Sequence, residues 1–115
     1  MLLADFGSSY CKLLDTDAGT APEVVATRSI PQGMQADLAT GHNAQRRSRQ
    51  AINELTALAR GGHQLIHDTD FVLLDCGSRD LKYIRYADSE VVAMGWNTEC
   101  GASMGFTIEL LQKYY

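Results

Sequence analysis

An aspartate, a glycine, a serine and a lysine recur at the same spacing in two places along the chain. The first segment reads Asp5-Phe-Gly-Ser-Ser-Tyr-Cys-Lys12 and the second reads Asp75-Cys-Gly-Ser-Arg-Asp-Leu-Lys82, so the two copies lie 70 positions apart. Each copy follows an apolar run and precedes an acidic turn and the letters Glu-Val-Val-Ala, at residues 23–26 and 90–93. An ordered series used twice indicates an internal duplication.

The duplicated segment has the composition of a phosphate-binding turn. An aspartate at the end of a strand can hold a hydrated Mg²⁺ ion or orient an attacking water, and Asp5 and Asp75 have that position. Glycine lets the backbone approach a ligand, and the amides, hydroxyls and ammonium groups that follow can bind phosphate oxygens. These donors are Gly7, Ser8, Ser9 and Lys12 in the first copy and Gly77, Ser78 and Lys82 in the second. Two such turns facing each other would grip a polyphosphate, and the alternative is ordinary hairpin turns with solvated lysines.

The two segments resemble the phosphate-1 and phosphate-2 loops of the actin, sugar-kinase and heat-shock-chaperone ATPase superfamily. The closer resemblance is to the activator ATPases of 2-hydroxyacyl-CoA dehydratases and benzoyl-CoA reductases. Their first loop, Asp-x-Gly-Ser-Thr-x-x-Lys, is matched with Ser9 in place of Thr, and their second, Asp-Ile-Gly-Gly-Gln-Asp-x-Lys, with Ser78 and Arg79 in place of Gly-Gln. Ala39-Thr-Gly41 follows half of the family segment Ala-Thr-Gly-Tyr-Gly-Arg, and residues 96–105 stand where the family has Met-Asn-Asp-Lys-Cys-Ala-Ala-Gly-Thr-Gly.

The resemblance implies an α/β fold, a reduced ribonuclease-H-like (actin-type) ATPase fold with two antiparallel β-meander units, each followed by a helix. Residues 1–69 would form the first ATPase lobe, with the phosphate-1 hairpin and a helix at 44–60. Residues 70–115 would begin the second lobe, with the phosphate-2 hairpin, the loop around Cys100 and a terminal helix. The family places a helix between the third strand and the Ala-Thr-Gly segment, and this chain has too few residues there for it.

The resemblance also implies a function, that of a partial activator-type ATPase. The chain would bind the phosphates of Mg-ATP. Asp5 and Asp75 would hold hydrated magnesium and orient the attacking water. In its full-length or assembled form it would couple hydrolysis to iron–sulfur-dependent electron transfer to an acyl-CoA dehydratase or reductase partner. Cys100 matches one ligand of a [4Fe–4S] cluster that the family shares between the subunits of a homodimer. A four-iron cluster takes four thiolates, and the family's second cysteine has no counterpart here.

A second hypothesis starts from what the chain lacks. The superfamily's Gly-Gly motif for adenosine has no match after Lys113, so a separate C-terminal half would have to supply it. A non-catalytic interaction module with the ATPase fold, or a truncated fragment, therefore stays open as the alternative function.

Composition narrows the classes of protein. The 115 residues are 45% hydrophobic and 21% charged, as in a soluble globular protein. A net charge of −4 argues against a nucleic-acid platform, and no apolar run is long enough to span a membrane. The opening residues do not form a signal peptide, so we expect a cytoplasmic protein. Cys11, Cys76 and Cys100 form no Cys-x-x-Cys pair, which argues against a zinc site.

Strands and helices follow from apolar runs and turn residues. We expect strands at 2–6, 10–16, 22–30, 36–40, 71–76, 81–86 and 90–94. The apolar run before Asp75 predicts a strand buried on both faces. A helix over 44–60 would be capped by Asn43 and stopped by Gly61-Gly62. The terminal helix would carry an apolar stripe of Met104, Ile108, Leu111 and Tyr115.

Overall fold

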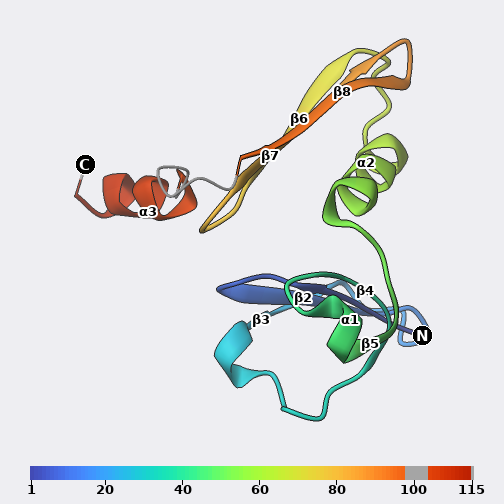
Figure 1. The fold of residues 1–115 in the computed structure, drawn as a ribbon, viewed down its shortest axis with the longest axis vertical. Helices are drawn as coiled ribbons and strands as arrows, with labels where there is room; N and C mark the ends of the chain where they lie inside the picture. The colour runs from blue at the N-terminus through green and yellow to red at the C-terminus, as the bar shows by residue number, and fades with distance from the viewer. Residues whose placement is uncertain (98–103, 115) are drawn as a thin grey trace. The chain divides into compact units, whose positions relative to one another are not determined.

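The chain forms two compact units in a computed structural model that describes residues 1–97 and 104–114 (Figure 1). The first unit is Met1–Glu54 and the second is Leu55–Tyr115. This division falls earlier than the predicted lobe boundary at 69/70. The helix at Glu54–Leu65 packs on the sheet that follows it, where Tyr86 bonds to Ala59, and it therefore belongs to the second unit.

A five-stranded mixed sheet makes up the first unit. The strands β1, β2 and β3 form the expected antiparallel meander, and β4 pairs in parallel with β1 while β5 pairs in parallel with β4. The order across the sheet is β3-β2-β1-β4-β5. The strand bounds are β1 Leu2–Phe6, β2 Tyr10–Asp15, β3 Glu23–Ala26, β4 Ala36–Gly41 and β5 Ser48–Ala51.

The connections in this sheet are short. A 3₁₀ turn at Thr27–Ser29 (η1) lies between β3 and β4, and a one-turn helix at Ala44–Arg47 (α1) lies between β4 and β5. The predicted third strand is therefore too long, and the predicted helix at 44–60 is wrong. Ser48–Ala51 pairs with β4 instead, because a strand edge supplies hydrogen bonds that outweigh the local helix preference. Asn43 has a left-handed φ of 60° and makes no side-chain cap.

Small side chains let these short connections pack on one face of the sheet. Ala4 and Ala39 are buried there beside Phe6 and Cys11, and Ile30 from the loop after η1 closes the cluster. Alanine has no side-chain entropy to lose and permits close approach of the loop. The core of this unit is therefore built without a long covering helix.

The second unit has an antiparallel sheet of order β6-β7-β8. Its bounds are α2 Glu54–Leu65, β6 Phe71–Cys76, β7 Leu81–Ala87 and β8 Glu90–Asn97. Helix α2 covers one face, where the Tyr86 hydroxyl donates to the Ala59 carbonyl and the rings of Phe71 and Tyr86 stack at 4.3 Å. Val72 and Leu74 on the other face are 57% and 61% exposed, so the prediction of burial on both faces is wrong for the described chain.

Two further features concern helices. Gly61 and Gly62 lie inside α2, with no left-handed conformation, so the predicted stop is wrong.

Helix α3, Met104–Tyr114, has exposed Ile108 and Leu111 side chains. In the described ranges, no helix has the length and apolar character needed to cross a bilayer.

Candidate phosphate-binding hairpins

The two copies of the repeated segment form hairpins of identical register. Asp5 pairs with Lys12 across the first hairpin, and Asp75 pairs with Lys82 across the second. The last paired residues enclose four-residue turns, at 7–10 and at 77–80. Because a β-strand alternates its side chains, this register puts each aspartate beside its lysine on one face.

The two Glu-Val-Val-Ala segments of the repeat do not occupy equivalent positions in the structure. Residues 23–26 pair with β2 beside the turn and face Lys12 through Val24. Residues 90–93 lie at the far end of the longer strand β8, and the residue opposite Lys82 is Trp96. The predicted duplication therefore holds for the hairpins and not for the third strands.

The first turn depends on Gly7 and on Thr27. A Cβ at position 7 would collide with the carbonyl oxygen of Tyr10, so glycine is required by close approach. The Thr27 hydroxyl donates to the Gly7 carbonyl at 2.8 Å, and the Thr27 amide donates to the Ser9 carbonyl at 2.9 Å. Thr27 thus braces the turn and leaves Ser8 and Ser9 exposed. No pattern in the sequence predicts this role of Thr27, because the contact comes from the turn after β3.

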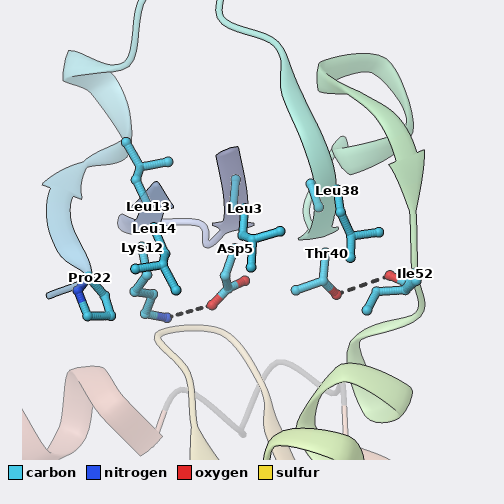
Figure 2. Close-up of a pocket in the computed structure, with 11 residues that line it drawn as sticks. Leu3, Asp5, Lys12, Leu13, Leu14, Pro22, Leu38, Thr40 and Ile52 are labelled. Atoms are coloured by element: carbon cyan, nitrogen blue, oxygen red, sulfur yellow. Dashed lines mark hydrogen bonds and ion pairs between the residues drawn. The ribbon is translucent and has the colours of Figure 1, made fainter. Parts of the chain in front are cut away.

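An ion pair lies on the other face of the first sheet. Lys12 Nζ is 2.8 Å from Asp5 Oδ2, and the two side chains are 52% and 39% exposed. They border an otherwise mainly apolar pocket of about 290 Å³ (Figure 2). Its lining includes Leu3, Leu14, Leu38 and Ile52. Among the described residues, Asp5 is the one ion-pair partner of Lys12, and the lysine is accessible, so it can turn toward an anion.

The end of β4 adjoins the first turn. Gly41 has a φ of 92°, and a Cβ there would lie 2.5 Å from the Phe6 carbonyl oxygen. The His42 amide donates to that same oxygen at 2.7 Å. The Thr40 hydroxyl is bonded to the Ile52 carbonyl at 3.1 Å (Figure 2). The segment Ala39-Thr-Gly41 therefore fixes the strand that carries Asp5.

The second turn is closed by Asp80. The Gly77 amide donates to the Asp80 carbonyl at 2.9 Å, and a Cβ at Gly77 would collide with the Asp80 carboxylate. Lys82 is only 4% exposed, and its Nζ lies 2.8 Å from Asp80 Oδ2 and 3.5 Å from Asp75 Oδ2. This lysine differs from Lys12 in burial and in partners.

The residues predicted to bind phosphate lie in two groups, one in each hairpin. The first contains Asp5, Gly7, Ser8, Ser9 and Lys12, and the second contains Asp75, Gly77, Ser78 and Lys82. Carboxylates, turn amides and an accessible lysine are a donor set that fits hydrated Mg²⁺ and phosphate.

The predicted iron ligand cannot be placed in the same way. Cys100 lies outside the described residues. Of the described cysteines, Cys11 is buried with its Sγ 3.4 Å from the Thr27 hydroxyl, and Cys76 is exposed. Within the described ranges, no three His, Cys, Asp or Glu side chains are grouped to hold a metal ion.

The sheet order and the two hairpins belong to an α/β fold that this chain shares with solved structures of larger proteins. The chain is similar to component A of (R)-2-hydroxyglutaryl-CoA dehydratase from Acidaminococcus fermentans, with a TM-score of 0.69 and 21% identity over 98% of this chain. It is also similar to an exopolyphosphatase from Cytophaga hutchinsonii (TM-score 0.55, 13% identity, 99% covered) and to the ethanolamine utilization protein EutJ from Carboxydothermus hydrogenoformans (0.53, 13%, 98%).

These similarities cover part of the larger proteins. The chain spans 52%, 53% and 56% of the three solved structures, or about half of each. No model of a protein family matches the sequence, and no curated protein matches it. The comparisons establish the fold, which has the expected α/β class. The first sheet differs from the expected antiparallel meander because β4 and β5 add parallel pairs to it.

Proposed function

We propose that this chain binds the phosphates of Mg-ATP with its two hairpin turns, as part of an activator-type ATPase. The observation that carries the proposal is the shared register, in which Asp5 and Lys12, and again Asp75 and Lys82, flank a glycine-led turn of the same length. Two unrelated hairpins would not be expected to carry an aspartate, a glycine and a lysine at the same three positions of the turn and its flanking strands. The actin-type fold supports it.

The residues of the first hairpin suggest a division of tasks. The Lys12 ammonium would leave Asp5 and bind a phosphate oxygen, while the amides and hydroxyls of Ser8 and Ser9 donate to the same group. Asp5, released from Lys12, would accept hydrogen bonds from water on magnesium or orient the attacking water, and Asp75 would have the same task in the second hairpin. Magnesium would neutralise charge on the phosphates.

In a full-length or assembled protein, we propose that hydrolysis is coupled to iron–sulfur-dependent electron transfer to an acyl-CoA enzyme. The support is the resemblance of the loops and the likeness to a dehydratase component A. Cys100 would contribute one thiolate per subunit to a [4Fe–4S] cluster shared by a homodimer. A separate C-terminal half would supply the adenosine contacts.

Calorimetric titration with Mg-ATP tests the binding proposal. Saturable heat is expected for the purified chain, with affinity lowered at least about tenfold in Lys12→Met because a charge-assisted bond is worth about 1.5–3 kcal/mol. Arg85→Met removes the same charge from an exposed position of β7 and serves as the control. A flat trace for the unaltered chain at millimolar nucleotide removes the proposal for a chain of this length.

An interaction module is the second candidate function. It is favoured by the exposed apolar side chains of the second unit, among them Val72, Leu74, Ile108 and Leu111. Sedimentation of the unaltered chain and of Leu111→Glu distinguishes the two. Self-association that Leu111→Glu abolishes, together with a flat Mg-ATP titration, favours the module.

A further inference from the structure

The two lysines of the repeated hairpins occupy different environments. Lys82 is 4% exposed, whereas Lys12, at the equivalent register, is 52% exposed. Burying an ammonium group is costly unless it is paired and hydrogen-bonded, so Lys82 must be held by its surroundings.

Two sequence differences produce this contrast. Position 80 is aspartate, whereas the equivalent position of the first turn is Tyr10. The third-strand residue opposite the lysine is Trp96 in the second unit and Val24 in the first. Asp80 adds a carboxylate and Trp96 adds an aromatic face, at positions where the first hairpin has a tyrosine and a valine.

These three side chains form one connected unit. Lys82 Nζ lies 2.8 Å from Asp80 Oδ2, and Trp96 Nε1 donates to that same oxygen at 2.8 Å. Lys82 Nζ also lies 4.9 Å from the centroid of the Trp96 ring, within the range of a cation–π contact. Asp80 closes the turn by accepting the Gly77 amide on its carbonyl. The side-chain unit is thus joined directly to the backbone of the second turn.

If Lys82 turned toward a phosphate, the Asp80 carboxylate would lose its cation. That carboxylate would then lie unpaired near the phosphate, which is also an anion. The half-exposed Lys12 has no such obstacle, since a surface ion pair contributes only about 0–1 kcal/mol. The ammonium of Lys82 is therefore better suited to hold the turn than to bind ligand.

We propose that Asp80, Lys82 and Trp96 are positioning residues that fix the second turn in the shape that presents its amides to phosphate, with Lys12 supplying the mobile charge. This inference rests on the proposed Mg-ATP binding. It reassigns Lys82 from phosphate ligand to support of the turn.

Fluorescence gives a test that does not need nucleotide, because Trp96 is the single tryptophan of the chain. In Lys82→Met and in Asp80→Asn, emission is expected to shift to the red and acrylamide quenching to increase at least about twofold. The control Arg85→Met removes a charge from the same strand and should leave both unchanged. Lys82→Arg, which keeps the charge, should recover most of the native spectrum. Spectra of Lys82→Met and Asp80→Asn identical to the native one, with far-ultraviolet dichroism retained, overturn the proposal.

Titration with Mg-ATP well below the melting temperature tests positioning against mere stability. Lys82→Met is expected to bind about tenfold more weakly and Lys82→Arg nearly as well as the unaltered chain. A changed Trp96 spectrum with unchanged affinity means that the unit only stabilises the sheet, and the positioning role is wrong. A flat trace for the unaltered chain overturns the Mg-ATP proposal and this role together, while the fluorescence still decides whether the three side chains hold the turn.

Discussion

The ion pair between Lys12 and Asp5 is the contact whose strength decides how the first turn can work. Both side chains are more than one-third exposed, so the pair should couple by about 0.2–1 kcal/mol. A double-mutant cycle with Lys12→Met and Asp5→Asn, measured by urea unfolding, gives this coupling. It should fall further in about 1 M salt, because screening acts strongly on exposed charges. A coupling above about 2 kcal/mol that salt does not change would mean that Lys12 is fixed to Asp5 and is not free for phosphate.

A glycine supports the strand that carries Asp5. Gly41 combines a φ of 92° with backbone contact to Phe6, so Gly41→Ala is expected to cost about 1–3 kcal/mol from backbone strain alone. Gly33→Ala is the matched control, since a Cβ at position 33 meets nothing within 4 Å and its φ is not positive. Thermal unfolding of the two variants compares them. Equal melting temperatures would contradict the role assigned to Gly41.

Residue roles were partly readable from the sequence. The spacing of Asp5, Gly7 and Lys12 predicted a hairpin, and the structure adds that the register of its short turn sets the acid beside the base. The difference between Lys12 and Lys82 could not be predicted in this way. It depends on Trp96 from the next strand, β8, and the register between β7 and β8 shifts by one residue between Arg85 and Tyr86. Counting residues from the turn therefore does not predict which residue lies opposite Lys82.

At the scale of elements, the adjacent glycines in α2 offer a paired test of helix packing. Gly61 faces open space, so Gly61→Ala should stabilise the chain by about 0.5–1 kcal/mol through helix propensity. A Cβ at Gly62 would lie 2.7 Å from Leu73 Cδ2, so Gly62→Ala forces Leu73 or the helix to move. Gly62→Ala should therefore be less stable than Gly61→Ala by at least about 1 kcal/mol in urea unfolding. Equal gains at both positions would show that α2 is not packed against β6.

The strands were predicted better than the helices, for a physical reason. Apolar runs that end at Asp and Gly predicted both ends of β1 and of β6 correctly. The segment 44–60 has the composition of a helix, yet Ser48–Ala51 became β5 because the parallel edge of β4 was available to it. That edge is created by β1 joining β4 across about 30 residues of chain, which no local pattern encodes.

At the scale of the whole molecule, the sheet of the first unit forms with very short connections. The order β3-β2-β1-β4-β5 forms although only the 3₁₀ turn η1 lies between β3 and β4 and only the one-turn helix α1 lies between β4 and β5. Alanines at positions 4, 36, 39 and 44 make this feasible, because they let the connections lie close to the sheet. The topology therefore depends on strand pairing more than on the covering helices.

The iron–sulfur proposal gives a prediction about stoichiometry. Two copies of the chain offer two Cys100 thiolates, and a four-iron cluster normally takes four. Cys11 is buried against Thr27 and is not available as a ligand without rearrangement of the first core. Anaerobic reconstitution should therefore yield well under one cluster per dimer by iron and sulfide analysis, and Cys100→Ser should abolish what is bound. A yield near four iron and four sulfide per dimer would contradict this ligand count and would assign the missing pair of ligands to the exposed Cys76, which Cys76→Ser would then test.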